Sequence, residues 1–171
     1  DSLVAAVQNG ADAVYFGGNM FNARRGAVNF DGEEMKRAIR YAHLYNVKVY
    51  ITFNILIKEH ELDEALNFLY LLDELNVDGV IVQDIGLVKL IREEFPNLPI
   101  HASTQMTIHN IEGLRALEDM GISRAILARE VTLKEIENMV SKSSIELEVF
   151  IHGALCICYS GQCLMSSMLG G

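Results

Sequence analysis

The sequence has no long apolar run and few positive charges. Nowhere in its 171 residues does a stretch approach the roughly 18 apolar residues of a membrane span, and no basic segment leads into an apolar one as in a signal peptide. Lys and Arg number 14 against 23 Asp and Glu, which gives a net charge of -9. We therefore expect a soluble, cytoplasmic protein that contacts no membrane. If it binds nucleic acid, parts outside this chain must supply most of the attraction.

The sequence also lacks a glycine-rich nucleotide-binding turn and polar linkers. No G-x-G-x-x-G motif follows a strand-like run, although the nucleotide-binding form of an open doubly wound sheet needs one. Without a low-complexity linker, and at a length that suits one core, residues 1–171 are expected to form a single domain. Asp1 opens directly on a helical pattern and the chain stops at Gly170-Gly171. We therefore expect this domain to be incomplete at both ends.

What is present is an alternation of apolar, β-branched runs with amphipathic stretches, which is typical of βα units on a parallel sheet. Asp31 and Thr132 are predicted N-caps, and Gly121 a C-cap glycine. The expected strands are residues 13–17, 47–53, 79–83, 100–103, 124–128 and 147–151, and the expected helices are 33–45, 61–75, 87–94, 111–120 and 133–140. We predict an α/β fold, a partial (β/α)8 TIM-like barrel of about six parallel units with open edges. An open doubly wound sheet is the alternative.

Polar side chains follow nearly every expected strand. Functional groups of such barrels come from the C-terminal ends of the strands, and an Arg there holds a carboxylate by paired hydrogen bonds. The alternative is that strand ends are polar because they meet solvent, with Arg129 and Glu130 as a rim ion pair. We predict substrate-binding roles for Arg24, Arg25, Asn54, Gln83, Asp84, Gln105 and Arg129, and catalytic roles for His152 and Glu130, and we interpret His43, His60, His101 and His109 as structural or solvated.

All three cysteines lie within residues 156–163, directly after an apolar run. Thiolates hold zinc or iron-sulfur clusters, whereas an isolated buried cysteine is a small hydrophobe. The odd number and tight spacing favour reduced thiols or metal ligands over a secreted disulfide framework. Zinc bound by His152, Cys156, Cys158 and Cys163 is one alternative, although the C-x-C pair is tight for tetrahedral geometry.

The cysteine segment resembles the signature of the peptidase U32 family. Residues 148–156 (EVFIHGALC), 159–163 (YSGQC) and Ser166 carry the resemblance, so that residues 148–166 form the signature segment. Residues 11–18 and 21–24 resemble the N-terminal block of the family, and residues 103–106 its central block. The resemblance implies a barrel-like domain whose first strand lies upstream of Asp1. It also implies an enzyme, since the family includes collagenase-like proteases and proteins of oxygen-independent hydroxylation.

In the hydroxylation-linked members, four cysteines bind a [4Fe-4S] cluster. The resemblance carries two of these ligands onto Cys156 and Cys163 and puts two beyond Gly171, so this chain alone is expected to hold the cluster poorly or not at all. Cys158 is then a reserve ligand. For RNA-modifying members the resemblance implies prephenate as the hydroxyl donor. From charge and position alone, Arg24, Arg25 or Arg129 is the expected binder of that dicarboxylate.

Three functions follow as hypotheses. The first is cluster-dependent hydroxylation of an RNA base, a tRNA uridine or an rRNA cytidine. The second is a collagenase-like peptidase acting on a peptide, with a metal-activated water or with the Cys156 thiolate activated by His152. The third is a non-catalytic, cluster-binding subunit that pairs with a paralogue, as in ubiquinone hydroxylation. The sequence does not identify a substrate or a general base.

Overall fold

Six short parallel strands form one curved sheet. The computed structural model describes residues 2–23, 29–153 and 156–164. The strands are β1 (Ala13–Gly17), β2 (Lys48–Phe53), β3 (Gly79–Val82), β4 (Ile100–Ala102), β5 (Arg124–Ile126) and β6 (Glu146–Glu148). Each strand pairs in parallel with the next one in sequence. This sequential order is that of a half-barrel and differs from a doubly wound sheet, whose order reverses at a switch point. The predicted partial barrel is confirmed.

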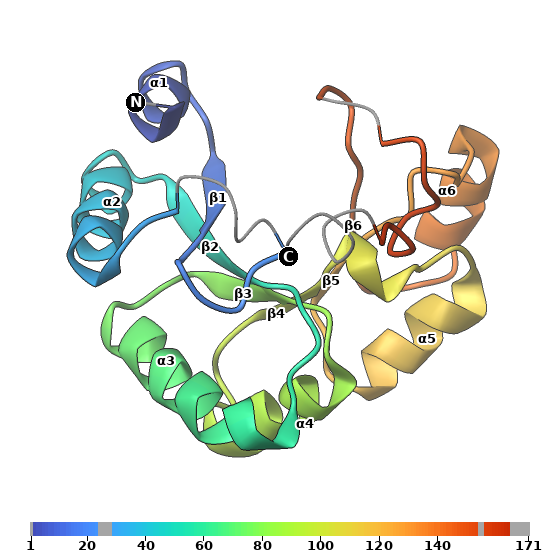
Figure 1. Cartoon of the computed structure of the whole chain (residues 1–171). Coiled ribbons are helices and arrows are strands. Elements are labelled where there is room, and N and C mark those ends of the chain that lie inside the picture. Colours follow the sequence, from blue (N-terminus) through green and yellow to red (C-terminus); the bar gives the residue numbers. More distant parts are fainter. Residues whose placement is uncertain (1, 24–28, 154–155, 165–171) are drawn as a thin grey trace.

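Helices link the strands and cover the convex side of the sheet (Figure 1). They are α1 (Ser2–Gln8), α2 (Gly32–Leu44), α3 (Leu62–Glu74), α4 (Ile85–Glu94), α5 (Ile111–Asp119) and α6 (Leu133–Val140), with short 3-10 helices η1 (Glu59–Glu61) and η2 (Thr104–Met106). Asp31 and Thr132 cap α2 and α6 in reciprocal capping boxes with Glu34 and Glu135, as predicted. Gly121, with φ +74°, follows α5 as the expected left-handed C-terminal glycine. Among the described residues, no helix has the length and apolar character needed to cross a bilayer.

Alternation along the strands separates a large core from the concave face. In β2, Val49, Ile51 and Phe53 point to the helices and are completely buried, because successive side chains of a strand leave opposite faces. Tyr50, between them, belongs instead to a small second cluster with Ile81 and Ile126 on the concave face. The helices therefore hold the sheet from outside, and the concave side is left for polar groups and a cavity.

An ion-pair network lies on the concave face near the start of the strands. The guanidinium of Arg124 donates to Glu146 at 2.6 Å and to Glu148 at 3.4 Å, which ties β5 to the edge strand β6. The same guanidinium lies 5.3 Å from the centre of the Tyr50 ring, and that ring packs 4.5 Å from the buried ring of His101. These contacts fill the barrel interior near the N-terminal ends of the strands, whereas the site lies at their C-terminal ends.

Candidate functional site

A cavity of about 920 Å³ opens at the carboxyl ends of the strands. Its walls come from β1 and β2, from the segments after β4 and β5, and from the chain beyond β6. Tyr15, Asn22, Thr52, Ser103 and Tyr159 contribute polar groups to it. Of the residues predicted from the sequence, the cavity is lined by Asn54, Gln105, Arg129, His152, Cys156 and Cys163. The topology of the half-barrel thus brings residues about 100 positions apart around one space.

Other predicted substrate-binding residues lie elsewhere. Asp84 is the N-cap of α4, where its carboxylate accepts hydrogen bonds from the backbone of Leu87 at 2.8 Å and of Ile57 at 3.2 Å. Neither Asp84 nor its neighbour Gln83 is among the cavity-lining residues. Arg24 and Arg25 lie outside the described residues. The binding roles of these four residues stay predictions. Asp84 already has a structural role as the N-cap of α4.

The three cysteine thiols converge. Their sulfur atoms lie within 4.8 Å of one another, and all three cysteines are free, with Cys156 and Cys163 exposed and Cys158 half-buried. A hydrogen bond from the backbone of Cys158 lowers the pKa of Cys156, and the neighbouring thiol of Cys163 and the charge of Arg129 add to this. The hydrogen bond with Cys163 raises the pKa of Cys158. One thiol is thus favoured as the first to ionise.

His152 is not a member of this cluster. It is exposed and lines the cavity, but the close group of possible ligands among the described residues contains the three sulfurs only. The zinc alternative with His152 as a fourth ligand therefore has no support in the geometry. The predicted catalytic role of His152 is not tested by its position.

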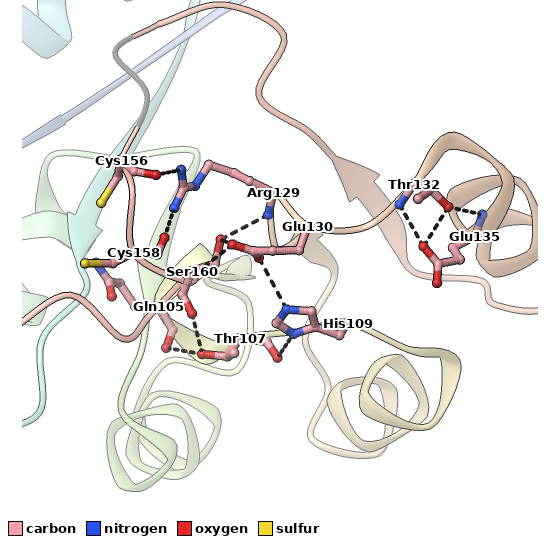
Figure 2. A network of polar contacts seen from close by, with 10 residues as sticks. All are labelled: Gln105, Thr107, His109, Arg129, Glu130, Thr132, Glu135, Cys156, Cys158 and Ser160. Atoms are coloured by element: carbon pink, nitrogen blue, oxygen red, sulfur yellow. Dashed lines mark hydrogen bonds and ion pairs between the residues drawn. The ribbon is translucent and has the colours of Figure 1, made fainter.

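Arg129 binds the backbone of the first two cysteines (Figure 2). Its two terminal nitrogens donate to the backbone carbonyl oxygens of Cys156 and Cys158, each at 2.7 Å. A planar guanidinium suits such a forked contact. Two of the five N–H groups of the guanidinium are therefore engaged with the protein's own backbone, which leaves the others for a ligand.

Glu130 anchors the same segment at Ser160. Its carboxylate accepts hydrogen bonds from the backbone N–H of Ser160 at 3.0 Å and from its hydroxyl at 3.4 Å, while that hydroxyl accepts from the backbone of Arg129 at 3.0 Å. Partial burial of Glu130 opposes ionisation, but the hydrogen bonds from Ser160 outweigh it and the pKa of Glu130 is lowered. Arg129 and Glu130 thus hold different parts of the cysteine segment, which a simple rim ion pair would not do.

Two further residues of this network were not singled out from the sequence. His109 lies with Nε2 3.3 Å from the Glu130 carboxylate and Nδ1 3.0 Å from the Thr107 carbonyl. Thr107, in a left-handed conformation, donates to the carbonyl of Ser160 at 3.2 Å. The interpretation of His109 as structural or solvated gave no partner for it. The one available sequence signal was its place just after the block at residues 103–106.

Gly161 makes the close approach of the two segments feasible. Its φ is +76°, and a Cβ atom there would meet the hydroxyl of Thr107 and lie 2.7 Å from the Gln105 carbonyl oxygen. Only glycine combines this backbone conformation with this space. The Ser160-Gly161 pair is therefore the docking point of the cysteine segment on the chain that follows β4.

A sequence model of Peptidase family U32 matches residues 1–171. The chain belongs to this family. The resemblance carried by residues 148–166 is thereby confirmed for the whole chain. The solved structure of the U32 peptidase Mk0906 superposes with a TM-score of 0.65 at 18% sequence identity, covering 81% of this chain and 60% of that one. At that identity the likeness shows the fold alone.

Two relatives of this U32 chain have names that state an activity. It is 39% identical over 167 residues to the tRNA hydroxylation protein P1 of Bacillus subtilis (strain 168), covering 98% of this chain and 40% of that protein. It is also 39% identical over 168 residues to the 23S rRNA 5-hydroxycytidine C2501 synthase of Escherichia coli (strain K12), covering 97% of this chain and 25% of that protein. The chain thus spans well under half the length of either relative.

Proposed function

We propose that this chain supplies the thiol-bearing half-barrel of an enzyme that hydroxylates an RNA base with the help of an iron-sulfur cluster. The observation that carries the proposal is the convergence of three thiols within 4.8 Å on the edge of a cavity of about 920 Å³. The two relatives named for tRNA hydroxylation and for rRNA hydroxycytidine synthesis give the reaction class. The segment that holds the thiols lies within the family signature of residues 148–166.

The donor set fits a cluster. Soft thiolates are the usual ligands of iron-sulfur centres, and the lowered pKa of Cys156 favours its thiolate form. Cys156 and Cys163 would hold the group, with two more ligands from a part of the protein outside this chain. When bound, a [4Fe-4S] cluster supplies one-electron chemistry. The residues Arg129 and Glu130 keep the cysteine segment in place through Cys156, Cys158 and Ser160.

The cavity lining suits a neutral, flat, hydrogen-bonding group. Asn54 accepts from the backbone of Ala23 at 3.0 Å, so its amide N–H groups are the part available to a ligand. Gln105 brings a second amide to the cavity. Amides offer both donors and acceptors, as the edge of a nucleobase requires, and enzymes that modify a base take it out of its stack into such a pocket.

A carboxylate donor such as prephenate needs cationic groups. Since part of the Arg129 guanidinium is engaged with Cys156 and Cys158, we propose Arg24 and Arg25 as the main binders of that co-substrate. The net charge of -9 also means that the RNA-binding surface belongs to another part of the full protein. The proposal therefore gives this chain the cavity and two cluster ligands.

The test uses full-length protein purified without oxygen. About four irons and four sulfides per chain are expected, and both should be lost in Cys156→Ala and Cys163→Ala but kept in Ser141→Ala, an exposed position outside the cavity. In a strain lacking the gene, mass spectrometry of total RNA nucleosides should show the loss of one hydroxylated base, restored by the wild type and not by Cys156→Ala. Zinc or no metal would refute the cluster, and unchanged nucleosides would refute the reaction.

Two observations favour the peptidase alternative: the chain is 30% identical over 178 residues to a protein of Porphyromonas gingivalis named collagenase, and the pKa of the exposed Cys156 thiol is lowered. A thiolate at the edge of a cavity is a nucleophile in principle. No histidine among the described residues belongs to the close group around the sulfurs, so the base that a cysteine peptidase uses is not in place. Cleavage of a denatured collagen substrate by wild type, abolished in Cys156→Ala and in His152→Ala, would reverse this order of preference.

A further inference from the structure

The third cysteine, Cys158, is placed as closely as the two that the family signature requires. Its sulfur lies within 4.8 Å of those of both Cys156 and Cys163. Its carbonyl oxygen accepts a 2.7 Å hydrogen bond from Arg129, the same length as the bond to Cys156. Cys158 is half-buried and does not line the cavity, but its sulfur is as close to the other two as they are to each other within the same limit.

We propose that Cys158 is a metal ligand, so that Cys156, Cys158 and Cys163 form a three-thiolate site for a soft metal ion, and that Arg129 is the positioning residue that sets their spacing. The inference rests on the proposed function and deepens it, because it concerns the same site: Cys158 would take one of the two cluster positions assigned above to ligands outside this chain. It does not depend on hydroxylation, since thiolate coordination of a metal is a property of the sulfur set alone.

The segment has little apolar burial to hold the sulfurs together. Ile157, the residue between the first two cysteines, is fully exposed, and Tyr159 and Leu164 are mostly exposed as well. Hydrogen bonds must therefore determine the conformation. Two adjacent peptide groups are fixed when a single guanidinium binds both of their carbonyl oxygens, because the two donors of the fork keep a constant separation.

A second anchor brings the third sulfur into place. Ser160 is 2% exposed and is held by Glu130 and by the backbone of Arg129. Gly161 packs against Thr107 and Gln105, and Cys163 follows two residues later. The Arg129 bonds hold residues 156 and 158 and the Glu130 bonds hold Ser160 (Figure 2), and the sulfur of Cys163 lies close to those of the C-x-C pair.

The charge balance also suits a metal. Binding a divalent ion converts three thiols to thiolates and releases three protons, which leaves a net charge of minus one on the metal and its ligands. The positive charge of Arg129 lies directly behind two of these ligands. A lysine would supply the charge without the fork, and a glutamine would supply neither, so these two substitutions separate the two contributions.

The experiment titrates Cd²⁺ into reduced, metal-free full-length protein under nitrogen, with the sulfur-to-cadmium charge-transfer absorbance in the ultraviolet as the readout. Cys158→Ser is expected to lose the same absorbance as Cys156→Ser, the share of one thiolate. Arg129→Gln should keep the absorbance at saturation but bind at least about tenfold more weakly, with Arg129→Lys in between. Arg115→Gln is the matched control, because within the described part of the chain Arg115 pairs only with Glu112, on the exposed face of α5, and it should change neither quantity.

Unchanged absorbance and affinity in Cys158→Ser would overturn the ligand role, and unchanged affinity in Arg129→Gln would overturn the positioning role. If Cys158→Ser does not fold, alkylation of the wild type decides, because bound cadmium should protect the Cys158 thiol from iodoacetamide as fully as it protects Cys156. Normal cadmium binding, together with no change in the RNA nucleosides of the strain lacking the gene, would refute the proposed function alone. Alkylation of Cys158 at the same rate with and without cadmium, together with normal hydroxylation, would refute this inference alone.

Discussion

The hydroxyl oxygen of Ser160 lies 3.0 Å from the backbone nitrogen of Arg129, although 31 residues separate them in the sequence. This bond, with the two from Ser160 to Glu130, joins the end of β5 to the cysteine segment. Ser160 is one of the few buried polar residues described. It therefore connects the stability of the sheet to the position of the thiols.

Removing this hydroxyl is expected to weaken the fold and the metal site together. Ser160→Ala leaves the Arg129 N–H without its acceptor, and a buried donor without a partner costs about 1–2 kcal/mol. Urea denaturation should show a loss of that size. Ser141→Ala, at an exposed position, should show almost none. Equal midpoints for the two variants would contradict the role of Ser160.

A side chain at position 161 is expected to displace the cysteine segment. Gly161→Ala incurs both the cost of a positive φ and the collision with Thr107 and Gln105. Gly10→Ala is the matched control, because Gly10 has a φ of +84° with no atom near its Cβ position. We expect a loss of about 1 kcal/mol for the control and at least about 2 kcal/mol for Gly161→Ala. Similar losses in the two would mean that the segment does not dock where the geometry puts it.

Stability is expected to fall with acid because of His101. Burial of this ring, which is 4% exposed, and the nearby Arg124 lower its pKa from 6.5 to about 4. The unfolded chain takes up the proton near pH 6.5 and the folded chain only near pH 4. The free energy of unfolding therefore decreases as the pH falls through this window, by about 3 kcal/mol in all.

Denaturant titrations between about pH 7 and pH 4 measure this slope. His101→Phe, which keeps a ring against Tyr50, should flatten it, whereas His60→Gln at an exposed site should keep it. The same slope in wild type and in His101→Phe would assign the acid sensitivity to another group.

The turn before β6 is expected to depend on one carboxylate. A single oxygen of Glu118 accepts bonds from the hydroxyl and backbone groups of residues 143–145 at 2.6 to 3.2 Å. The hydrogen bond from Ser143, followed by that from the backbone of Ser144, lowers the pKa of Glu118. The stabilisation is present above the unfolded pKa of 4.5 and is lost as the pH falls through the folded value.

Hydrogen exchange tests this carboxylate directly. In Glu118→Gln the amides of Ser144 and Ile145 should exchange about tenfold faster at neutral pH, because a charged acceptor is replaced by a neutral one. Glu112→Gln, on the exposed face of the same helix, should leave both rates unchanged. Unchanged rates in Glu118→Gln would mean that the loop is held by its own backbone.

Sequence reasoning succeeded where one local pattern was sufficient. The apolar run of residues 13–17 gave β1 without error, and Asp31 and Thr132 marked two helix starts. It failed at β6, where residues 147–151 were expected and Glu146–Glu148 form the strand. Glu148 pairs with Ile126, the last residue of β5, so the apolar residues that follow have no ladder partner on that side.

The site was located from the sequence but its contacts were not. Arg129 and Glu130 were predicted as site residues because they follow an expected strand. The cysteines were predicted as ligands because they are closely spaced in the sequence. The bonds from Arg129 to Cys156 and Cys158 span 27 and 29 residues, and a guanidinium looks the same in sequence whether it binds a substrate or a carbonyl. His109 was missed for the same reason, since its partner Glu130 lies on another loop.

The sequential strand order has a consequence for biosynthesis. Because each strand pairs with the one made just before it, the growing sheet adds one strand at a time from the N-terminus as the ribosome releases the chain. Thr107, His109, Arg129 and Glu130 all precede Cys156. The receptor for the thiol segment is therefore synthesised before the first thiol emerges, so the segment reaches residues that the ribosome has already released.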